Sequence, residues 1–517
     1  MPAGHGQARA GSMNDTPMTL DRRRAGVLLH PTSLPETPGN GDLGPQAYRF
    51  VDFLRAAGGS LWQTLPLGPT QGTGSPYQSP SVHAGNPLLI SLEWLLARGW
   101  LDEEVLRSPE SRSPALFRRT ALHQAFEGFQ EHADRPARAS FTHFREERGW
   151  WLEDYALFVA LHQRYRGRSW VDWPIPLRNR EAKALDEARA SLSMQIGQVC
   201  FEQYVFFSQW LELKRYANRH GILLFGDMPI FVAHDSADVW AHRDYFDLRP
   251  GGRPATVAGV PPDYFSPTGQ LWGNPLYRWE ALQADGFRWW KQRLRTQLEL
   301  FDLIRIDHFR GLQAYWEVPA DEPTAENGRW VEAPGHALLE ALHEAFGALP
   351  LVAEDLGTIT PEVEALRKAF GIPGMRVLQF AFDGGPDNPY LPHNHEANTV
   401  VYTGTHDNDT SCGWFESLDR RQQVHVLDYL GLPQESMPWP LIRSALASTA
   451  RLAVVPMQDL MGLGPEHRMN TPGTVEGNWQ WRYSWDQIDP GLAARVHHLV
   501  GLYGRGEGTR EGLAGPE

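Results

Sequence analysis

The chain has 517 residues, and its content of 42% hydrophobic and 21% charged residues is typical of a soluble, folded protein. A net charge of −14 excludes the concentrated basic surface that nucleic acids or anionic lipids require, so we expect no nucleic-acid or membrane partner. No apolar run approaches the roughly 20 residues that span a bilayer. A chain of this length is expected to form a large domain with substantial insertions.

Only two cysteines occur, Cys200 and Cys412, and their wide separation indicates neither a disulfide framework nor a zinc site. This cysteine use fits a reducing compartment, and the predicted location is the cytoplasm. Residues 1–22 are small and polar, include arginines and lack the apolar segment of a signal peptide, so they are expected to form a disordered tail.

Eight short apolar runs recur along the chain, and several of them end in polar residues. Near-continuous apolar runs of this length are typical of strands that are covered on both faces. The predicted strands lie at 27–30, 61–65, 222–227, 303–307, 351–354, 377–382, 399–403 and 452–456.

Helical patterns lie between these runs. One predicted helix spans 45–57, with Phe50 and Leu54 on its apolar stripe, and stops at two glycines. Another begins at Thr360, which has the features of an N-cap, and ends at Gly371. Eight strands alternating with helices predict an α/β fold, a (β/α)8 TIM barrel with large, mostly helical insertions. A doubly wound parallel sheet is the alternative.

Two connections are too long for simple strand-to-helix units. Residues 70–200 are rich in helical pattern and are predicted to form a mostly helical inserted subdomain. The catalytic barrel would comprise 23–69 and 201–500, with a second, loop-rich insertion at about 229–300. Residues 501–517 are expected to be a flexible C-terminal tail.

Acidic residues end or follow four of the apolar runs: Asp227, Asp307, Glu354 and Asp407. The active site of a β/α barrel lies at the C-terminal ends of its strands, so these acids would surround one pocket. Arg305 lies two residues before Asp307 and shares its face of the strand, where it can keep that carboxylate ionised. Chemistry at glycosidic bonds needs such a carboxylate together with a protonated carboxylic acid.

Metal-assisted hydrolysis is an alternative use of clustered carboxylates. His393 and His395 lie two apart in a loop with no third ligand nearby in sequence, so we interpret both as hydrogen-bonding loop residues. No metal and no cofactor is predicted. Cys412 follows Asp407 by five residues, has no histidine partner, and is interpreted as a small buried thiol.

Several longer segments match, in order, the motifs of a known family. They are Gly226-Asp-Met-Pro-Ile-Phe-Val232, Asp302-Leu-Ile-Arg-Ile-Asp-His-Phe-Arg-Gly311, Val352-Ala-Glu-Asp-Leu-Gly357 and Gly404-Thr-His-Asp-Asn-Asp-Thr410, with Ser75-Pro-Tyr-Gln78, Ala84-Gly-Asn-Pro87 and the loop 259–275. From about residue 25 to about residue 500, the chain resembles glycoside hydrolase family 77, the amylomaltase-type 4-α-glucanotransferases.

This resemblance implies roles for the acids. Asp307 would be the nucleophile that forms a covalent glucosyl intermediate, and Arg305 would steady it. Glu354 would act first as general acid and then as general base. Asp407 would be the third acid, which grips sugar hydroxyls. The implied activity is transfer of α-1,4-glucan segments between maltodextrin chains.

The resemblance also implies residues that bind the substrate, an α-1,4-glucan. The bound sugar would contact Arg305, His406, Asp227, Tyr77, Asp263, Trp272 and Asn470. Structural roles are the alternative for some of them: Asp227 and Arg305 could form an ion pair of the barrel, and Tyr77 or Trp272 could be packing anchors. The chain departs from the family pattern at Gly72, commonly tyrosine, and at Pro267, commonly glutamate.

Other functions remain as alternatives at this point. An α-amylase-type hydrolase would use the same acids, and a non-catalytic glycan-binding protein would share the groove. A phosphate-dependent barrel enzyme is a weaker alternative, because no glycine-rich phosphate loop precedes a helix.

Overall fold

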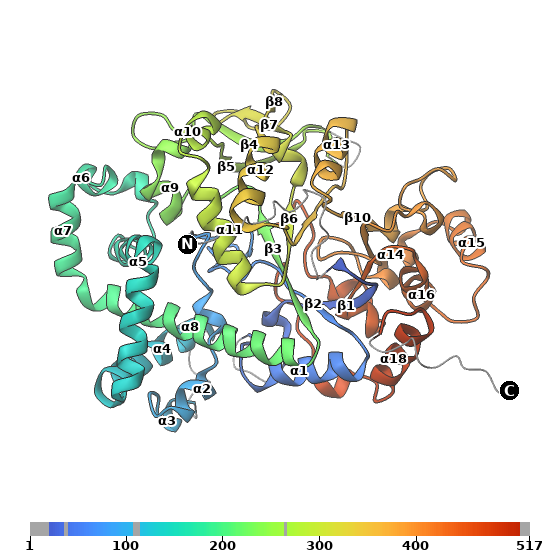
Figure 1. The fold of residues 1–517 in the computed structure, drawn as a ribbon, viewed down its shortest axis with the longest axis horizontal. Helices are drawn as coiled ribbons and strands as arrows, with labels where there is room; N and C mark the ends of the chain where they lie inside the picture. The colour runs from blue at the N-terminus through green and yellow to red at the C-terminus, as the bar shows by residue number, and fades with distance from the viewer. Residues whose placement is uncertain (1–19, 36–39, 107–113, 263–265, 507–517) are drawn as a thin grey trace, which may run out of the picture.

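Eight parallel strands form the centre of the molecule. The computed structural model describes residues 20–35, 40–106, 114–262 and 266–506 (Figure 1). Neighbouring strands are hydrogen-bonded in the order β10-β11-β12-β1-β2-β3-β6-β9. Their bounds are β1 (Arg24–Leu28), β2 (Leu61–Gln63), β3 (Leu223–Pro229), β6 (Leu303–Asp307), β9 (Leu351–Ala353), β10 (Gly374–Val377), β11 (Thr399–Tyr402) and β12 (Leu452–Pro456).

These strands follow one another around a nearly closed barrel. The first strand, β1, pairs with the last strand, β12, on one side and with β2 on the other. Between the two ends of the order, the N–H of Ala353 donates to the carbonyl oxygen of Pro373 at 2.8 Å. The close approach of β2 requires a glycine in β1, because a Cβ on Gly26 would lie 2.5 Å from that of Leu61. The predicted (β/α)8 barrel is confirmed, and the alternative of a doubly wound sheet is wrong.

Each of the eight apolar runs overlaps a barrel strand, but the sixth strand lies earlier than predicted. We expected it at 377–382, whereas β10 ends at Val377 and a 3-10 helix, η7 (Leu378–Phe380), follows. Leu378 and Ala381 are buried all the same. The apolar run therefore reflects core packing beyond the end of the strand.

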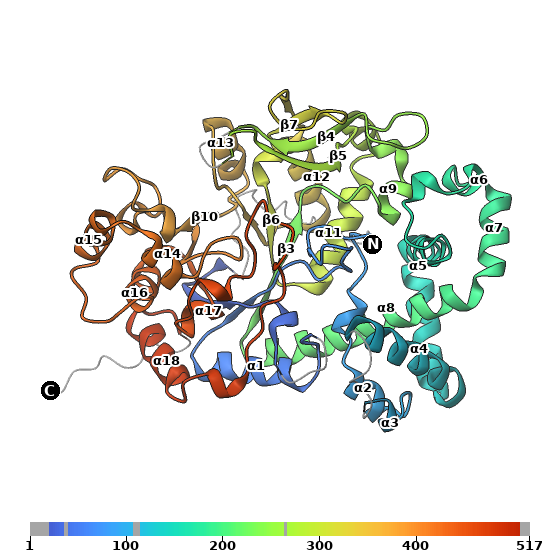
Figure 2. The ribbon, with the colours of Figure 1, turned by 180° about the vertical axis from the view of Figure 1, so that it is seen from behind.

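Helices cover the outside of the barrel (Figure 2). In α1 (Pro45–Ala56), Phe50, Val51 and Leu54 are buried, as the predicted stripe requires, and Gly58 follows with φ +70°. The helix predicted after Thr360 is α13 (Pro361–Ala369). The others that flank the barrel strands include α11 (Arg288–Leu300), α12 (Gly335–Phe346), α16 (Trp439–Ala447) and α18 (Leu492–Leu502).

The segment between β2 and β3 contains a group of helices that projects from one side of the barrel (Figure 1). Two anchors fix it: Arg118 forms a buried 2.9 Å ion pair with Asp42, and the indole of Trp210 donates to the carbonyl of Leu300. The helices are α2 (Leu92–Ala97), α3 (Glu103–Leu106), α4 (Pro114–His132), α5 (Arg135–Arg164), α6 (Ile175–Arg178), α7 (Ala182–Ser191) and α8 (Ser193–Arg219).

A second sheet, which we did not predict, lies beyond the end of β6, at the top of Figure 1. Its four antiparallel strands have the order β5-β4-β7-β8, and two of them fall in the stretch expected to be loop-rich. That stretch also contains α9 (Ala237–Ala241) and α10 (Trp279–Ala284). The strands are β4 (Thr256–Val260), β5 (Gln270–Pro275), β7 (Ala314–Pro319) and β8 (Arg329–Glu332).

Both ends of the described chain pack against the barrel. Leu20 is buried, although we expected it to belong to a disordered tail. Arg505, expected to be flexible, is fully buried and donates to six carbonyl oxygens, those of Arg24, Ala445, Leu446, Ser448, Ala450 and Arg451. These bonds join the starts of β1 and β12, and sequence patterns carry no signal for such backbone acceptors. Within the described ranges, no helix is long and apolar enough to cross a membrane.

Candidate active site

Strands β3 and β6 bring a buried arginine between two aspartates. Arg305 is 4% exposed, and its Nη1 donates to both carboxylate oxygens of Asp227, at 2.8 and 2.7 Å. Its Nη2 lies 2.7 Å from Oδ1 of Asp307. Burial alone would lower the pKa of Arg305, but the two carboxylates raise it well above its ordinary value. The arginine therefore stays charged and compensates both acids.

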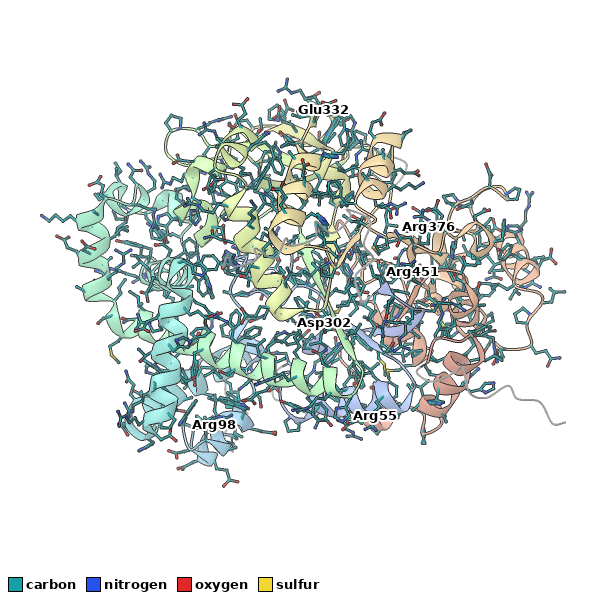
Figure 3. All side chains as sticks on the ribbon, in the orientation of Figure 1. Arg55, Arg98, Asp302, Glu332, Arg376 and Arg451 are labelled. Atoms are coloured by element: carbon teal, nitrogen blue, oxygen red, sulfur yellow. The ribbon has the colours of Figure 1, made fainter. Side chains whose placement is uncertain are left out.

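Asp307 is the open member of this group. Its side chain is 30% exposed, whereas that of Asp227 is 1% exposed. Burial raises the pKa of Asp227, against the opposing effect of Arg305. Asp307 is the last residue of β6, and Asp302 directly precedes this strand at its other end (Figure 3). Asp302 accepts a hydrogen bond from the side chain of Asn218 in α8. Asp307 therefore lies at the C-terminal, catalytic end of the barrel.

Glu354 follows β9 and is held by backbone donors. Its Oε2 accepts from the N–H of His308 at 2.7 Å, and its Oε1 accepts from the N–H of Leu356 at 3.0 Å. Burial, and then the charge of Asp307, raise the pKa of Glu354 to about 7 despite these bonds. A carboxyl group with this pKa is protonated in part of its population at neutral pH, as a general acid requires.

The loop after β11 carries the third acid. Asn470 donates to Oδ1 of Asp407 at 2.6 Å, and Nε2 of His406 lies 3.3 Å from Oδ2. Although burial acts in the other direction, His406 and then Asn470 hold the pKa of Asp407 far below its usual range. Asp407 in turn raises the pKa of His406 against the effect of burial. Asp407 is therefore a permanently ionised acceptor.

Tyr77 connects the two halves of the site. Its O–H donates to Oδ2 of Asp227 at 2.8 Å, and its oxygen lies 2.8 Å from Nε2 of His406. The Tyr77 and His406 rings also stack, with centroids 5.3 Å apart. The predicted residues from three separate strand ends thus form one hydrogen-bonded network.

Trp272, in β5, lies at the edge of the site. Its ring meets that of His308 edge to face, with centroids 4.8 Å apart, and it is half-buried. It therefore neighbours the residue that follows Asp307. Asp263, Tyr264 and Phe265, which belong to the same predicted loop, lie outside the described residues.

Asp355, next to Glu354, points away from the site. It accepts from the N–H of Met375 at 2.6 Å and forms ion pairs with Arg367 and Arg376, at 3.3 and 3.5 Å. It therefore ties β9 to β10. Adjacent residues of an extended chain face opposite sides, so only Glu354 is available for chemistry.

The other predicted side chains have ordinary structural contacts. His393 bonds to Tyr429, and His395 bonds to Ser448, as expected of loop residues. Cys412 was expected to be buried but is half-buried, and desolvation raises the pKa of its thiol to about 11. Across the residues that the structure describes, no three His, Cys, Asp or Glu side chains come together as a metal site.

Sequence reasoning missed three contributors. The backbone N–H of His308 has no sequence signal, because any residue but proline could donate there. Arg468 donates to the carbonyl of Asp407 at 3.0 Å. Asp459, buried behind the loop of Asp407, lies three residues beyond the β12 run, where an acid at a strand end could have been noticed.

A β/α barrel that presents an arginine-paired aspartate, a carboxyl group of raised pKa and a third carboxylate has the chemistry of an enzyme acting on glycosidic bonds. A family model described as 4-alpha-glucanotransferase (Glyco_hydro_77) matches residues 29–487. The chain belongs to this family, glycoside hydrolase family 77, and is a 4-alpha-glucanotransferase. The resemblance seen in the motifs is thereby confirmed.

Individual relatives are similar in sequence to this chain along nearly their whole length. The 4-alpha-glucanotransferase of Thermus thermophilus is 53% identical over 490 residues, covering 92% of this chain and 98% of the relative. That of a Synechocystis species is 49% identical, covering 94% and 99%. The structure of an amylomaltase from Streptococcus agalactiae, in complex with acarbose, superposes with a TM-score of 0.91 at 38% identity, covering 94% of this chain and all of that one.

Proposed function

We propose that this transferase moves α-1,4-glucan segments from a maltodextrin donor to the 4-hydroxyl of an acceptor glucan or glucose. The transfer is a retaining double displacement through a covalent glucosyl ester of Asp307. The observation that carries the proposal is the contrast between two carboxyl groups. Asp307 is paired with Arg305 at 2.7 Å, while burial raises the pKa of Glu354 to about 7, so that part of its population is protonated at neutral pH.

In the first half-reaction, Glu354 gives its proton to the glycosidic oxygen while a carboxylate oxygen of Asp307 attacks the anomeric carbon. The bond from that carbon to the leaving oxygen breaks, and the leaving chain departs with a free 4-hydroxyl. Retaining chemistry of this kind uses carboxyl groups about 5–5.5 Å apart. The bond from the N–H of His308 to Glu354 keeps the acid beside the nucleophile's own strand.

In the second half-reaction, the 4-hydroxyl of an acceptor attacks the same carbon from the side that the leaving chain vacated. Glu354 takes the hydroxyl proton, the ester bond breaks, and Asp307 leaves as a carboxylate. Two inversions give net retention and a new α-1,4 bond. Asp407, held ionised by His406, accepts hydrogen bonds from sugar hydroxyls as positive charge develops on the ring.

Transfer requires a sugar to outcompete water at the covalent intermediate. We assign acceptor binding and exclusion of water to the segment that contains Trp272, whose half-buried ring contacts His308 beside the nucleophile. The cytoplasm is the proposed location, which is consistent with the two free cysteines, Cys200 and Cys412.

Incubation of the purified protein with maltotriose tests the proposal. We expect glucose together with a ladder of longer maltodextrins, all with α-1,4 linkages. Shorter sugars alone would indicate an α-amylase-type hydrolase, and no turnover of any maltodextrin would indicate a glycan-binding protein. Mass spectrometry of protein quenched during turnover should reveal a glucosyl or maltosyl adduct on the peptide that contains Asp307.

A further inference from the structure

The loop that carries His406 and Asp407 is short and is held at both of its ends. It leaves the barrel after β11, where Thr403 is fully buried. It ends at α14 (Ser411–Ser417), whose first residue is also fully buried. The position of the third acid therefore depends on what fixes these two end residues.

One buried carboxylate binds both ends. Asp459 lies in α17 (Met457–Leu460), directly after β12, and is 1% exposed. Its Oδ2 accepts from the hydroxyls of Thr403, at 2.6 Å, and Ser411, at 2.7 Å. Its Oδ1 accepts from the backbone N–H of Ser411 at 2.7 Å. Both oxygens are thus used, and all three donors belong to the ends of the loop.

Packing supports the loop only in part. A cavity of about 30 Å³ is lined by Thr405, His406 and Asn408 of the loop and by His30 and Asp459. Side chains therefore leave a small space on this side of the loop. Asn408 accepts from the N–H and hydroxyl of Thr405, which stiffens the loop internally but does not attach it to the barrel.

The other attachments of the loop lie at His406, Asp407 and Asp409. Tyr77 hydrogen-bonds to His406, and Asn470 donates to the carboxylate of Asp407. Arg468 donates to the carbonyl of Asp407 at 3.0 Å, and Gln379 donates to that of Asp409 at 2.8 Å. Each fixes one point of the loop, and neither reaches Thr403 or Ser411. Among these contacts, only the carboxylate of Asp459 joins the two ends to each other and to the neighbouring strand.

We propose that Asp459 is a positioning residue for glucan transfer, whose carboxylate fixes both ends of the loop and so sets where His406 and Asp407 meet the sugar. The inference rests on the proposed role of Asp407. Asp459 is buried and both of its carboxylate oxygens are used by the ends of the loop, so it is not placed to contact the sugar itself. It acts through the position of Asp407, because displacing a contact to the transition state by about 1 Å can lower the rate on the order of 100-fold.

Asp459→Ala tests the proposal. We expect kcat for maltotriose disproportionation to fall roughly 10- to 100-fold, with a smaller change in KM. Asp459→Asn keeps one acceptor for the N–H of Ser411 and can turn its amide toward the two hydroxyls, so it should recover part of the loss. Asp42→Ala is the matched control. Asp42 is also buried and hydrogen-bonded, to Arg118 and to the N–H of Gly44, and neither partner belongs to the loop, so this variant should lose stability and keep kcat.

A double-mutant cycle separates positioning from general destabilisation. Fluoride release from α-maltosyl fluoride measures the low activity of Asp407→Ala. In that background, Asp459→Ala should cause almost no further loss, because the residue through which it acts is gone. Thr403→Val, which removes one donor to Asp459, should cause a smaller loss of activity that likewise requires Asp407. This variant replaces Asp459→Ala in the cycle if Asp459→Ala does not fold.

The inference is overturned if folded Asp459→Ala keeps the parent kcat, or if its loss is as large without Asp407 as with it. It is also overturned if Asp42→Ala lowers kcat as much as Asp459→Ala does, when the two variants have the same decrease in melting temperature. Failure of the proposed role of Asp407 has a different signature: Asp407→Ala would then retain full transfer, whatever happens at Asp459. Failure of the proposed function would appear as hydrolysis alone, or no turnover, by the parent protein.

Discussion

The backbone N–H of His308 donates to Oε2 of Glu354 at 2.7 Å, so the residue after the nucleophile holds the general acid. A second bond runs from the N–H of Phe309 to the carbonyl of Glu354. His308 adopts φ +54° and ψ +49°, a conformation that is uncommon for residues other than glycine. This unfavourable backbone conformation directs the N–H groups of His308 and Phe309 toward Glu354. It therefore couples the position of the general acid, Glu354, to that of the nucleophile, Asp307.

Asp307→Asn should almost abolish turnover, by at least about 1,000-fold. The amide is nearly isosteric but cannot form the glucosyl ester. We expect the fold to persist, because Arg305 keeps its bonds to Asp227. Sugar analysis after maltotriose incubation, together with circular dichroism, checks both points. Substantial transfer by pure variant protein would remove Asp307 as the nucleophile.

The pH dependence of kcat/KM should follow Glu354. Its pKa in the free enzyme is raised to about 7, and the protonated form is the one that can donate to the leaving group. The rate of the first half-reaction should therefore be retained below pH 7 and fall as pH rises through this value, approaching about tenfold per pH unit. Initial rates from pH 5 to 9 provide the measurement. A maltosyl donor with fluoride as leaving group needs less protonation and should show a weaker decline.

Tyr77→Phe should lower kcat/KM by about 10- to 100-fold, because it leaves buried hydrogen-bonding positions on Asp227 and His406 without their shared partner. The ring, and its stacking on His406, would be retained. Steady-state kinetics with maltotriose provide the test. If kcat/KM were unchanged while Tyr77→Ala destabilised the protein, Tyr77 would be a packing anchor only.

Trp272→Ala should raise the ratio of hydrolysis to transfer, because water would gain access beside His308. Glucose and longer products, quantified together from one maltotriose reaction, give the ratio. Trp330→Ala is a suitable control, since this exposed tryptophan of β8 contacts Arg310 rather than His308. Equal ratios in Trp272→Ala and the parent protein would argue against water exclusion by this ring.

Arg505→Met should lower the free energy of unfolding by at least about 3 kcal/mol, because six buried carbonyl groups lose a common donor. Urea denaturation provides the measurement. Transfer activity at low temperature should be unchanged, since these contacts lie at the N-terminal end of the barrel. A variant with parent stability would show that water replaces the guanidinium without loss.

The barrel and its acids were predictable because each depends on a local pattern. Apolar runs define buried parallel strands, and the fold places the ends of such strands together, which is why Asp307 and Glu354 could be named from sequence. The antiparallel sheet was missed because β5 contains Gly273, Asn274 and Pro275, residues typical of turns. Pairing with β4 imposes the extended conformation there, so tertiary contacts override local propensity.

The network around Asp407 needed three-dimensional information. Asn470 and Arg468 reach it from a segment more than fifty residues away in the chain, and Asp459 reaches it through the ends of its loop. No periodic pattern links such positions. Composition predicts no nucleic-acid partner, but it does not indicate which of the aromatic residues lie near the site.

The contacts of Arg505 also have a consequence for biosynthesis. Translation produces Arg24 of β1 481 residues before Arg505, yet the guanidinium of Arg505 bridges the beginnings of β1 and β12. The contact of Arg505 with the first and last barrel strands therefore forms only after the chain as far as Arg505 has left the ribosome. Nascent chains that end before Arg505 would lack the contact that holds β1 and β12 together. The strand edge exposed by their separation is a feature that chaperones and proteases recognise.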